Sequence, residues 1–235
     1  MKAIAMIPAR GGSKRVPRKN VRLLGGQPLI SYSIAAALRA RSVDRVIVNT
    51  DDDEIASVAA EAGAEVQRRP AELATDSAKT IGVVRHALGE LATQGNLYPF
   101  VVLLQPTSPF RQPSQIDKAV ELYDKHRCDS VVSHIRVDYF HPNRMKSIKN
   151  GKIVPYCEPE VENIPRSALR PAYYRDGSIY GFRWNLPLET DSLMGEDIRP
   201  IITNRDYFVN IDEERDWIIA EHILESNARL FDFWG

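Results

Sequence analysis

The chain has 235 residues, enough for one large domain with a sizeable hydrophobic core. Its 31 Lys and Arg residues balance 31 Asp and Glu residues, so the formal net charge is zero. This balance argues against a protein that coats nucleic acid or a membrane surface, because no overall field would attract those polyanions. The sequence has no apolar run of membrane-spanning length and no signal-peptide core. We therefore expect a soluble, cytoplasmic protein in which Cys128 and Cys157 are reduced thiols.

Short apolar runs typical of β-strands alternate with longer amphipathic patterns typical of helices. The expected strands are residues 3–8, 45–50, 100–105, 130–135, 178–182 and 207–211. The expected helices are residues 28–40, 52–63, 78–91, 113–126 and 213–228. Several strands are nearly continuous hydrophobic runs, as in parallel strands that are covered on both faces. The alternation predicts an α/β fold with a doubly wound, mostly parallel sheet, whose ligands bind at the carboxyl ends of its strands.

Residues 136–176 break this alternation. No long helix fits the segment, because it is interrupted by Pro142, Pro155, Pro159, Pro165 and Pro171. We expect an insertion there, which forms a hairpin, a lid or an oligomer contact. The strand pattern resumes at residue 178.

The first expected strand leads into a basic, glycine-containing loop with the sequence IPARGGSKRVPRKN at residues 7–20. Gly11 and Gly12 let the backbone approach an anion closely and direct N–H groups toward it, and the Ser13 hydroxyl adds a donor. The loop matches neither a Walker A motif nor a GxGxxG motif. A solvated basic loop is the alternative interpretation. The position at the end of the first strand favours a polyphosphate ligand.

Six short motifs follow one another along nearly the whole chain. They are Arg10-Gly-Gly-Ser13-Lys14 with Pro17-Arg-Lys19-Asn20, Val48-Asn-Thr-Asp51-Asp52, Arg68-Arg69-Pro70-Ala-Glu72-Leu-Ala-Thr-Asp76, Leu104-Gln105-Pro106-Thr107-Ser108-Pro109, Arg175-Asp176-Gly177-Ser-Ile-Tyr180 and Ile211-Asp212-Glu-Glu-Arg-Asp216. The ordered set resembles the CMP-sialic acid synthetases, or acylneuraminate cytidylyltransferases, including the synthetases for legionaminate-type acids.

The resemblance implies a single cytidylyltransferase domain over residues 1–235 with a Rossmann-like fold of the nucleotide-diphospho-sugar transferase type. The implied enzyme joins CTP to a nine-carbon 2-keto sugar acid, such as N-acetylneuraminate, and gives the CMP-sugar and pyrophosphate with Mg2+ as cofactor. The resemblance also implies a homodimer, with the 136–176 insertion contributing the acceptor wall and the dimer contact. Which sugar acid is the acceptor stays open.

The resemblance places Arg10, Ser13, Lys14 and Lys19 at the triphosphate and gives Asn20 a part in holding the nucleotide. Cations fit this place because departing pyrophosphate develops negative charge on the β- and γ-phosphates. We therefore expect Arg10, Lys14 and Lys19 to be catalytic. None of the five histidines is an obvious general base, and none has metal-ligand spacing.

The resemblance further places Arg69 at the cytosine ring and the stretch from Ala78 to Thr80 at the ribose. Arg69 precedes Pro70, which favours extended backbone. Its guanidinium can donate to the carbonyl oxygen and ring nitrogen that cytosine presents. A surface pair of arginines is the alternative interpretation.

The sugar acid is expected to meet Gln105, Arg166 and Tyr180, again by resemblance, with Arg166 pairing with its carboxylate. Gln105 ends a buried apolar strand, where a polar side chain needs a partner. An amide that caps the strand is the alternative. Arg170 and Arg175 are close enough in the sequence to compete with Arg166.

Asn210 and Asp212 depart from the family pattern, which is Asp-x-Asp at the end of a strand. Residues i and i+2 of a strand share a face, so two carboxylates there grip one Mg2+. Here the first residue of the pattern is Asn210, whose neutral amide oxygen is a weaker Mg2+ ligand than a carboxylate oxygen. Asp212 is alternatively the N-cap of the last helix, and residues 51–53 are interpreted as a helix start rather than an acidic site.

Two other functions remain open. One is a different nucleotidyltransferase, such as a Kdo cytidylyltransferase or a purine nucleotide-sugar pyrophosphorylase, against which Arg69 and the Gln105 motif argue. The other is a nucleotide-binding, non-catalytic homologue in which Asn210 marks lost metal chemistry. The basic loop and Asp212 argue against that alternative.

Overall fold

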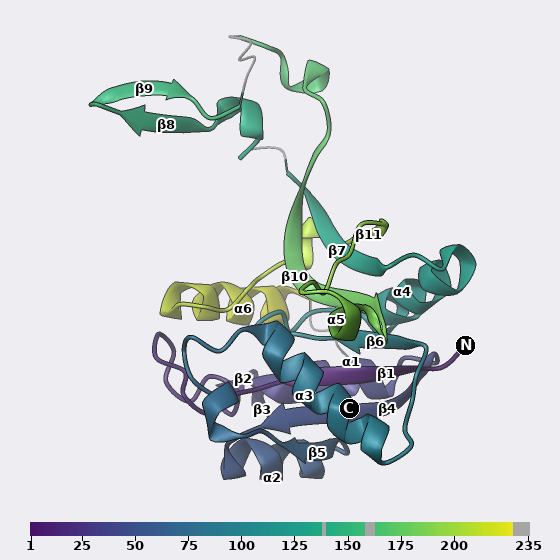
Figure 1. The fold of residues 1–235 in the computed structure, drawn as a ribbon. Helices are drawn as coiled ribbons and strands as arrows, with labels where there is room; N and C mark the ends of the chain where they lie inside the picture. Colours follow the sequence, from purple (N-terminus) through teal and green to yellow (C-terminus); the bar gives the residue numbers. More distant parts are fainter. Residues whose placement is uncertain (138–139, 158–162, 228–235) are drawn as a thin grey trace.

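The computed structural model describes residues 1–137, 140–157 and 163–227, and a seven-stranded sheet forms its centre (Figure 1). The strand order is β11-β7-β10-β6-β1-β4-β5. These strands are β1 (Ala3–Pro8), β4 (Val43–Thr50), β5 (Glu65–Arg68), β6 (Phe100–Leu103), β7 (Ser130–Val137), β10 (Ala172–Arg183) and β11 (Ile198–Ile202). Neighbouring strands are parallel except where β10 pairs with β6 and β7. The predicted mostly parallel sheet is confirmed.

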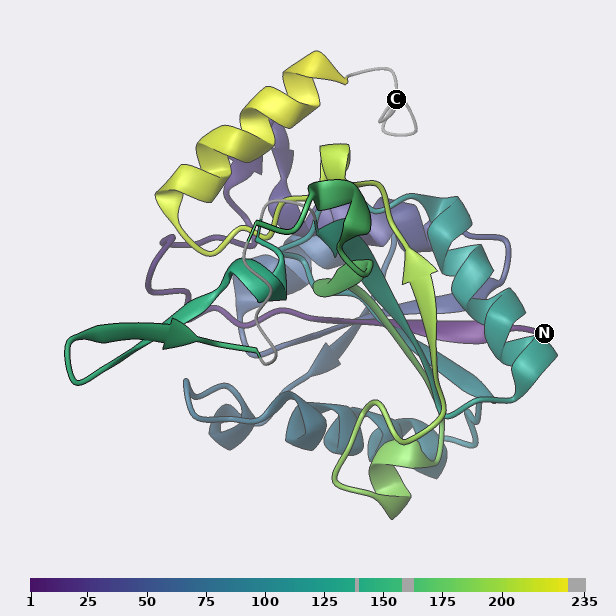
Figure 2. The ribbon, with the colours of Figure 1, turned by 90° about the horizontal axis from the view of Figure 1, so that it is seen from above.

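Helices cover both faces of the sheet (Figure 2). One face carries α1 (Leu29–Leu38), α2 (Asp53–Glu61) and α4 (Pro113–His126), and the other carries α3 (Thr80–Thr93) and α5 (Leu186–Glu189). The side chains of β1 alternate between the two cores, as the pleat of a strand requires. Ala5 and Ile7 pack in the core with α1, α2 and α4, whereas Ile4 and Met6 pack in the core with α3. The doubly wound α/β fold is therefore confirmed.

A third apolar cluster lies beneath α6 (Glu214–Ser226), beside the small β2 (Leu23–Leu24) and β3 (Gln27–Pro28) pair. It explains why the strand predicted at residues 207–211 is wrong. That segment forms the end of η4 (Arg205–Tyr207) and an irregular stretch, in which Val209 and Ile211 are buried against Trp217 of α6. The alternation of apolar residues therefore reflects burial under a helix, not membership of the sheet.

Two strands at the edges of the sheet had no clear sequence pattern. The side chains of β5 are mostly exposed, so this edge strand lacks a hydrophobic run. β11 contains Pro200, which cannot donate a ladder hydrogen bond and is tolerated because β11 pairs only with β7. Both strands end the sheet, where burial imposes the weakest pattern.

The predicted insertion forms an arm that projects away from the sheet (Figure 1). In the described residues 140–157 and 163–171 the arm contains η2 (Pro142–Arg144), the hairpin of β8 (Lys146–Lys149) and β9 (Lys152–Pro155), and η3 (Arg166–Ala168). Asn150 and Gly151 close the hairpin with φ values of 51° and 74°, as a two-residue turn of this kind requires. The predicted limits of 136 and 176 lie inside β7 and β10, whose pairing extends to Val137 and Ala172.

None of the helices in the described ranges is long and apolar enough to cross a membrane.

Candidate active site

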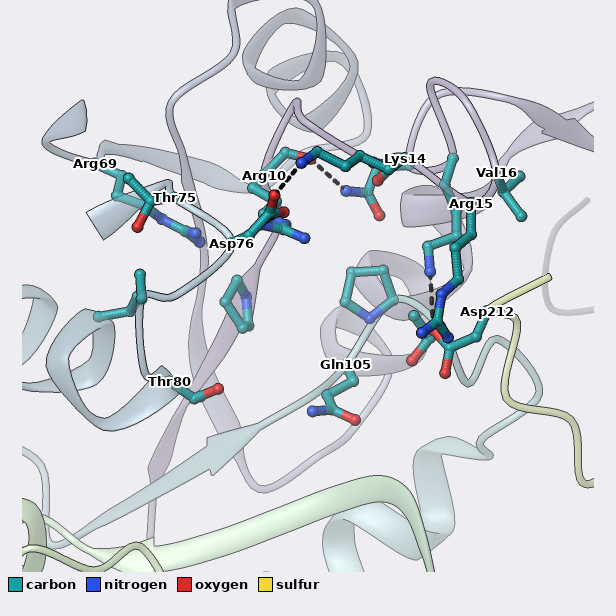
Figure 3. Close-up of a pocket in the computed structure, with 18 of the residues that line it drawn as sticks. Arg10, Lys14, Arg15, Val16, Arg69, Thr75, Asp76, Thr80, Gln105 and Asp212 are labelled. Carbon is teal, nitrogen blue, oxygen red and sulfur yellow. Dashed lines mark hydrogen bonds and ion pairs between the residues drawn. The ribbon is translucent and has the colours of Figure 1, made fainter. Parts of the chain in front are cut away.

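A cleft of about 600 Å3 opens at the carboxyl ends of β1 and β6 (Figure 3). Four of the six sequence motifs contribute to its walls. Eleven of the predicted site residues line it, namely Arg10, Ser13, Lys14, Lys19, Asn20, Arg69, Ala78, Thr80, Gln105, Asn210 and Asp212. Gly11, Gly12 and Tyr180 are not among the lining residues. The cleft therefore lies where a doubly wound sheet is expected to bind its ligand.

The basic loop is anchored from both ends. Asn20 is buried and donates from Nδ2 to the carbonyl oxygen of Arg10 at 3.0 Å. Arg18, with φ of 54°, turns its guanidinium onto Asp52 at 2.6 Å and onto Glu54. The Arg18 guanidinium holds the pKa of Asp52 below its usual range. Arg18 is therefore not among the loop cations that line the cleft, which are Arg10, Lys14, Arg15 and Lys19.

Asp52 also begins α2, as predicted. Its side chain accepts a hydrogen bond from the Ile55 N–H at 2.9 Å, so it is the N-cap of the helix. At the other end of α2, Gly63 has φ of 87°, in the left-handed region that favours glycine after a helix.

Gly11 has a packing reason to be glycine. A Cβ at Gly11 would overlap the side chain of Asp52, whereas a Cβ at Gly12 would meet no atom within 4 Å. The Gly11 N–H donates to Asp51 Oδ1 at 3.2 Å. Gly11 thus lets the loop lie against the start of α2, while the neighbouring Ser13 reaches the cleft.

Asp76 was not predicted as a site residue, yet its carboxylate joins the two loop cations across the cleft (Figure 3). Arg10 Nη1 lies 2.8 Å from Asp76 Oδ1, and Lys14 Nζ contacts Asp76 Oδ2. Lys14 and then Arg10 hold the pKa of Asp76 below its usual range. The carboxylate occupies the place between two cations that an anionic ligand would take. Its position as the last residue of the Arg68–Asp76 motif gave no signal of this pairing.

Arg69 is buried, with 9% of its surface exposed, so the alternative of a surface arginine pair is wrong for this residue. Nε donates to Asn49 Oδ1 and Nη2 donates to the Asn49 carbonyl oxygen, each at 2.8 Å. Burial lowers the pKa of Arg69, and Asp51 works in the opposite direction. The two hydrogen bonds to Asn49 hold the guanidinium in place through Nε and Nη2, so Nη1 is the nitrogen that does not contact Asn49. Its neighbour Arg68 points elsewhere and pairs with Asp53 at 2.7 Å.

Gln105 lies beyond the end of β6 and directs its side chain into the cleft (Figure 3). A Cβ at Gly177 would lie 3.1 Å from Gln105 Oε1 and 3.9 Å from the Tyr180 hydroxyl oxygen. Gln105 and Tyr180 therefore gather around the same backbone segment of β10. Burial raises the pKa of Tyr180. The side chain of Arg166 lies outside the described part of the structure, so its role stays a prediction.

Asn210 and Asp212 come together although they do not lie on a strand. Asn210 Nδ2 donates to Asp212 Oδ2 at 2.8 Å, and Lys19 Nζ donates to Asp212 Oδ1 at 3.2 Å and to the Ile211 carbonyl oxygen at 2.7 Å. Asn210 Oδ1 is buried and has no hydrogen-bond partner among the described residues. The N-cap of α6 is Glu213, which forms a capping box with Asp216. The alternative role of Asp212 as the cap is therefore wrong.

Comparison with known proteins agrees with this arrangement. A profile of the cytidylyltransferase family matches residues 4–201. The chain belongs to that family. It is 38% identical over 97% of its length to a CMP-N,N'-diacetyllegionaminic acid synthase of Legionella pneumophila, of which the match covers 98%. It is also 32% identical over 97% of its length to an N-acylneuraminate cytidylyltransferase of Escherichia coli, of which the match covers 53%. The predicted family is confirmed.

The fold of the family member agrees with a solved structure as well. The structure of a CMP:2-keto-3-deoxy-manno-octonic acid synthetase complexed with CTP superposes with a TM-score of 0.72. The superposition covers 96% of this chain and 99% of that chain at 16% sequence identity. At this identity the likeness supports the nucleotidyltransferase fold alone.

Proposed function

We propose that this chain is a synthetase that joins CTP to a nine-carbon 2-keto sugar acid and releases the CMP-sugar and pyrophosphate. The convergence of four motifs on one cleft of about 600 Å3 carries the proposal. That volume lies in the usual range for small-molecule sites. The cleft combines a cationic wall, a buried guanidinium and a neutral amide, which suit a triphosphate, a pyrimidine base and a hydroxylated acceptor respectively.

The nucleotide occupies the side of the cleft formed by the basic loop and by the segment before α3. Arg10, Lys14 and Lys19 surround the triphosphate, with Ser13 as a further donor. Arg69, held by Asn49, presents Nη1 to the acceptor atoms of cytosine, and the Ala78–Thr80 stretch meets the ribose. The rigid placement of Arg69 favours selection of one base, since little side-chain freedom is lost when the nucleotide binds.

The sugar acid occupies the side formed by Gln105 and β10. Its anomeric hydroxyl gives up its proton to solvent and attacks the α-phosphorus of CTP, a new oxygen–phosphorus bond forms, and the bond to the departing pyrophosphate breaks. Arg10, Lys14 and Lys19 stabilise the charge that develops on the leaving group. Tyr180 and Arg166 are the proposed further contacts to the acceptor.

The chemistry of the Asn210–Asp212 pair fits Mg2+. Asn210 offers a buried oxygen without a partner among the described residues, and Asp212 offers the charge. Mg2+ commonly takes one or two protein oxygens and completes its shell with phosphate oxygens and water. No cluster of three or more His, Cys, Asp or Glu side chains that could hold a metal occurs in the described ranges. When bound, the ion would neutralise charge on the phosphate oxygens.

The projecting arm suits a second copy of the chain, so we propose a homodimer. Apolar side chains stand exposed on the arm: Phe140, Met145, Ile148, Ile153 and Tyr156. Exposed apolar patches of this kind mark association surfaces. A cytoplasmic location is proposed on the basis of the free thiols of Cys128 and Cys157, which suit a reducing compartment.

The test is pyrophosphate release with CTP, Mg2+ and a panel of acids that contains N-acetylneuraminate, legionaminate, pseudaminate and Kdo. Release with at least one nine-carbon acid, and little with Kdo, is expected. Release with Kdo alone would assign a different acceptor class. CTP binding by calorimetry without release from any acid would indicate the non-catalytic homologue.

A further inference from the structure

A single buried arginine outside the cleft ties together three parts of the fold. Arg111 is 2% exposed. Nη2 donates to the carbonyl oxygen of Gln105 at 2.5 Å, Nε donates to the carbonyl oxygen of Ser178 at 2.9 Å, and Nη1 donates to the Ser33 hydroxyl at 2.5 Å. These partners belong to the loop after β6, to β10 and to α1. The guanidinium therefore fixes the backbone at Gln105 relative to the backbone at Ser178.

Arg111 keeps its positive charge although its side chain is buried. Burial lowers its pKa to about 9, and Asp176 works in the opposite direction, so the side chain is cationic at neutral pH. Asp176 is itself 4% exposed and accepts from the Ser178 N–H and hydroxyl at 3.0 Å each. Buried charges cost free energy, and well-packed apolar residues often stabilise a core as well or better. The charged network is therefore weak evidence for a stabilising role.

The segment that Arg111 holds is the irregular part of β10. The pairing register of β10 with β7 shifts between Arg175 and Tyr180. Within this stretch Gly177 has φ of 80°, and its missing Cβ leaves the space in which Gln105 Oε1 lies. A Cβ there would be 3.1 Å from that oxygen and 3.9 Å from the Tyr180 hydroxyl oxygen. The Gln105 amide oxygen and the Tyr180 hydroxyl therefore both lie within 4 Å of the position that a Cβ at Gly177 would take.

We propose that Arg111 is a positioning residue for the sugar acid. By holding the backbone at Gln105 and Ser178, Arg111 aligns Gln105 and Tyr180 as one acceptor wall. This assignment rests on the proposed function, because Gln105 and Tyr180 meet an acceptor only in that reaction. Arg111 is absent from the lining of the main cleft and instead borders a separate cavity of about 30 Å3, with Ser108 and Asp176. It therefore acts through the wall and does not touch the substrate.

Arg111→Lys tests positioning, because lysine keeps a hydrogen-bond donor but loses the planar fork that holds two carbonyl oxygens. We expect the KM for the preferred sugar acid to rise about tenfold or more, a loss of about 1.4 kcal/mol. The Kd for CTP, measured by calorimetry without acceptor, should stay within about twofold of the wild-type value, since the nucleotide wall does not contact Arg111. A general structural weakening would shift both quantities together.

Ser33→Ala is the matched control. It removes one buried hydrogen bond from the same guanidinium but leaves both carbonyl contacts, so the melting temperature should fall while the acceptor KM stays near the wild-type value. Gly177→Ala is an independent test that keeps Arg111, because its Cβ would crowd Gln105 Oε1 and strain the backbone. It should also raise the acceptor KM selectively.

The proposal is overturned if folded Arg111→Lys keeps the wild-type acceptor KM, or if its CTP Kd and acceptor KM rise equally. Should Arg111→Lys fail to fold, Gly177→Ala decides, and an unchanged acceptor KM there overturns the proposal. Absence of pyrophosphate release by the wild-type protein with every acid would overturn the proposed function first. The two failures are distinguishable, because the Arg111 proposal fails only in a protein that releases pyrophosphate, whereas the proposed function fails when no pyrophosphate is released.

Discussion

The side-chain amide of Asn210 donates to the carboxylate of Asp212, with Nδ2 at 2.8 Å from Oδ2. This contact orients the Asn210 Oδ1 oxygen, which has no partner among the described residues. The pair therefore places one negative charge, which Lys19 Nζ contacts at 3.2 Å, beside one neutral oxygen without a described partner at the edge of the cleft. Two carboxylates would repel each other at such a distance without a cation. The Asn210–Asp212 pair does not, so it can keep this geometry before a metal binds.

Asp212→Asn tests whether that charge holds Mg2+. We expect turnover to fall about 100-fold or more, because a group that stabilises transition-state charge is lost. The Mg2+ concentration at half-maximal rate should rise. The melting temperature should stay nearly constant, since Glu213 and not Asp212 is the N-cap of α6. Mg2+ titrations of the rate and of CTP binding by calorimetry check the expected changes.

Asp216→Ala is the control for this variant. Asp216 Oδ2 accepts the backbone N–H groups of Asp212 at 3.0 Å and of Glu213 at 2.9 Å. Its loss should cost about 1 kcal/mol of stability, as for other helix caps, without a change in the Mg2+ requirement. Asn210→Asp should lower that requirement. Wild-type rate and Mg2+ dependence in Asp212→Asn would remove Asp212 from the metal site.

Asp76→Asn should strengthen the binding of polyphosphates. The Asp76 carboxylate neutralises Arg10 and Lys14 in the structure, and a phosphate must displace it. Because exposed ion pairs are weak, the expected gain in CTP and pyrophosphate affinity is about two- to fivefold. Asp53→Asn removes the same charge from a pair with Arg68 away from the cleft and should leave both affinities unchanged. Weaker pyrophosphate binding by Asp76→Asn would show that Asp76 aligns the cations and does not compete with the ligand.

Arg69→Lys should reduce the preference for CTP over UTP. Lysine keeps the charge but cannot keep both contacts to Asn49 and also donate to the base. Loss of a charged hydrogen bond predicts about tenfold weaker CTP binding or more, with a smaller effect on UTP. Arg68→Lys changes the exposed neighbour and serves as the control. An unchanged ratio of the two nucleotide Kd values by calorimetry would exclude Arg69 from base recognition.

Stability should depend on pH through Asp129, at the far end of the sheet. Asp129 accepts from Arg183 Nε at 2.9 Å and from the Glu196 and Asp197 N–H groups at 2.9 and 3.1 Å, which lowers its pKa. A carboxylate with a lowered folded-state pKa stabilises the fold above its unfolded pKa, and this contribution is lost as pH falls through the folded-state value. Asp129→Asn should therefore be less stable than wild type at pH 7.

Urea unfolding of both proteins between pH 7 and pH 3 measures the change. The difference between their free energies of unfolding should shrink as the solution becomes more acidic. A difference that stays constant over this range would mean that the Asp129 charge contributes nothing to stability.

The sequence was sufficient for the elements whose burial imposes a pattern. The run at residues 3–8 and the helix at 113–126 both appear in the structure, because strong burial on defined faces creates continuous or periodic apolar residues. The edge strands β5 and β11 lack such burial and lacked a pattern. The stretch at 207–211 has alternation without a sheet, since Val209 and Ile211 are buried by α6. The local sequence pattern therefore shows that a side chain is buried, but it does not show which element of the fold buries it.

The residues of the candidate site likewise differ in whether the sequence could predict them. Residues at the ends of strands, such as Arg10 and Gln105, could be predicted because the carboxyl ends of parallel strands meet at one edge. Asp76 and Arg111 could not, because their importance arises from long-range contacts. Arg111 reaches Ser33 and Ser178, which are distant in the sequence, and nothing beside it signals a buried charge.

The most direct test of the central claim is phosphorus NMR of the wild-type protein with CTP, Mg2+ and each nine-carbon sugar acid. The account predicts that the α-, β- and γ-phosphate resonances of CTP are replaced, with at least one acid, by equal amounts of a CMP-sugar phosphodiester and pyrophosphate. Persistence of CTP with every acid, or its conversion to CDP and inorganic phosphate, would contradict transfer of CMP to a sugar acid.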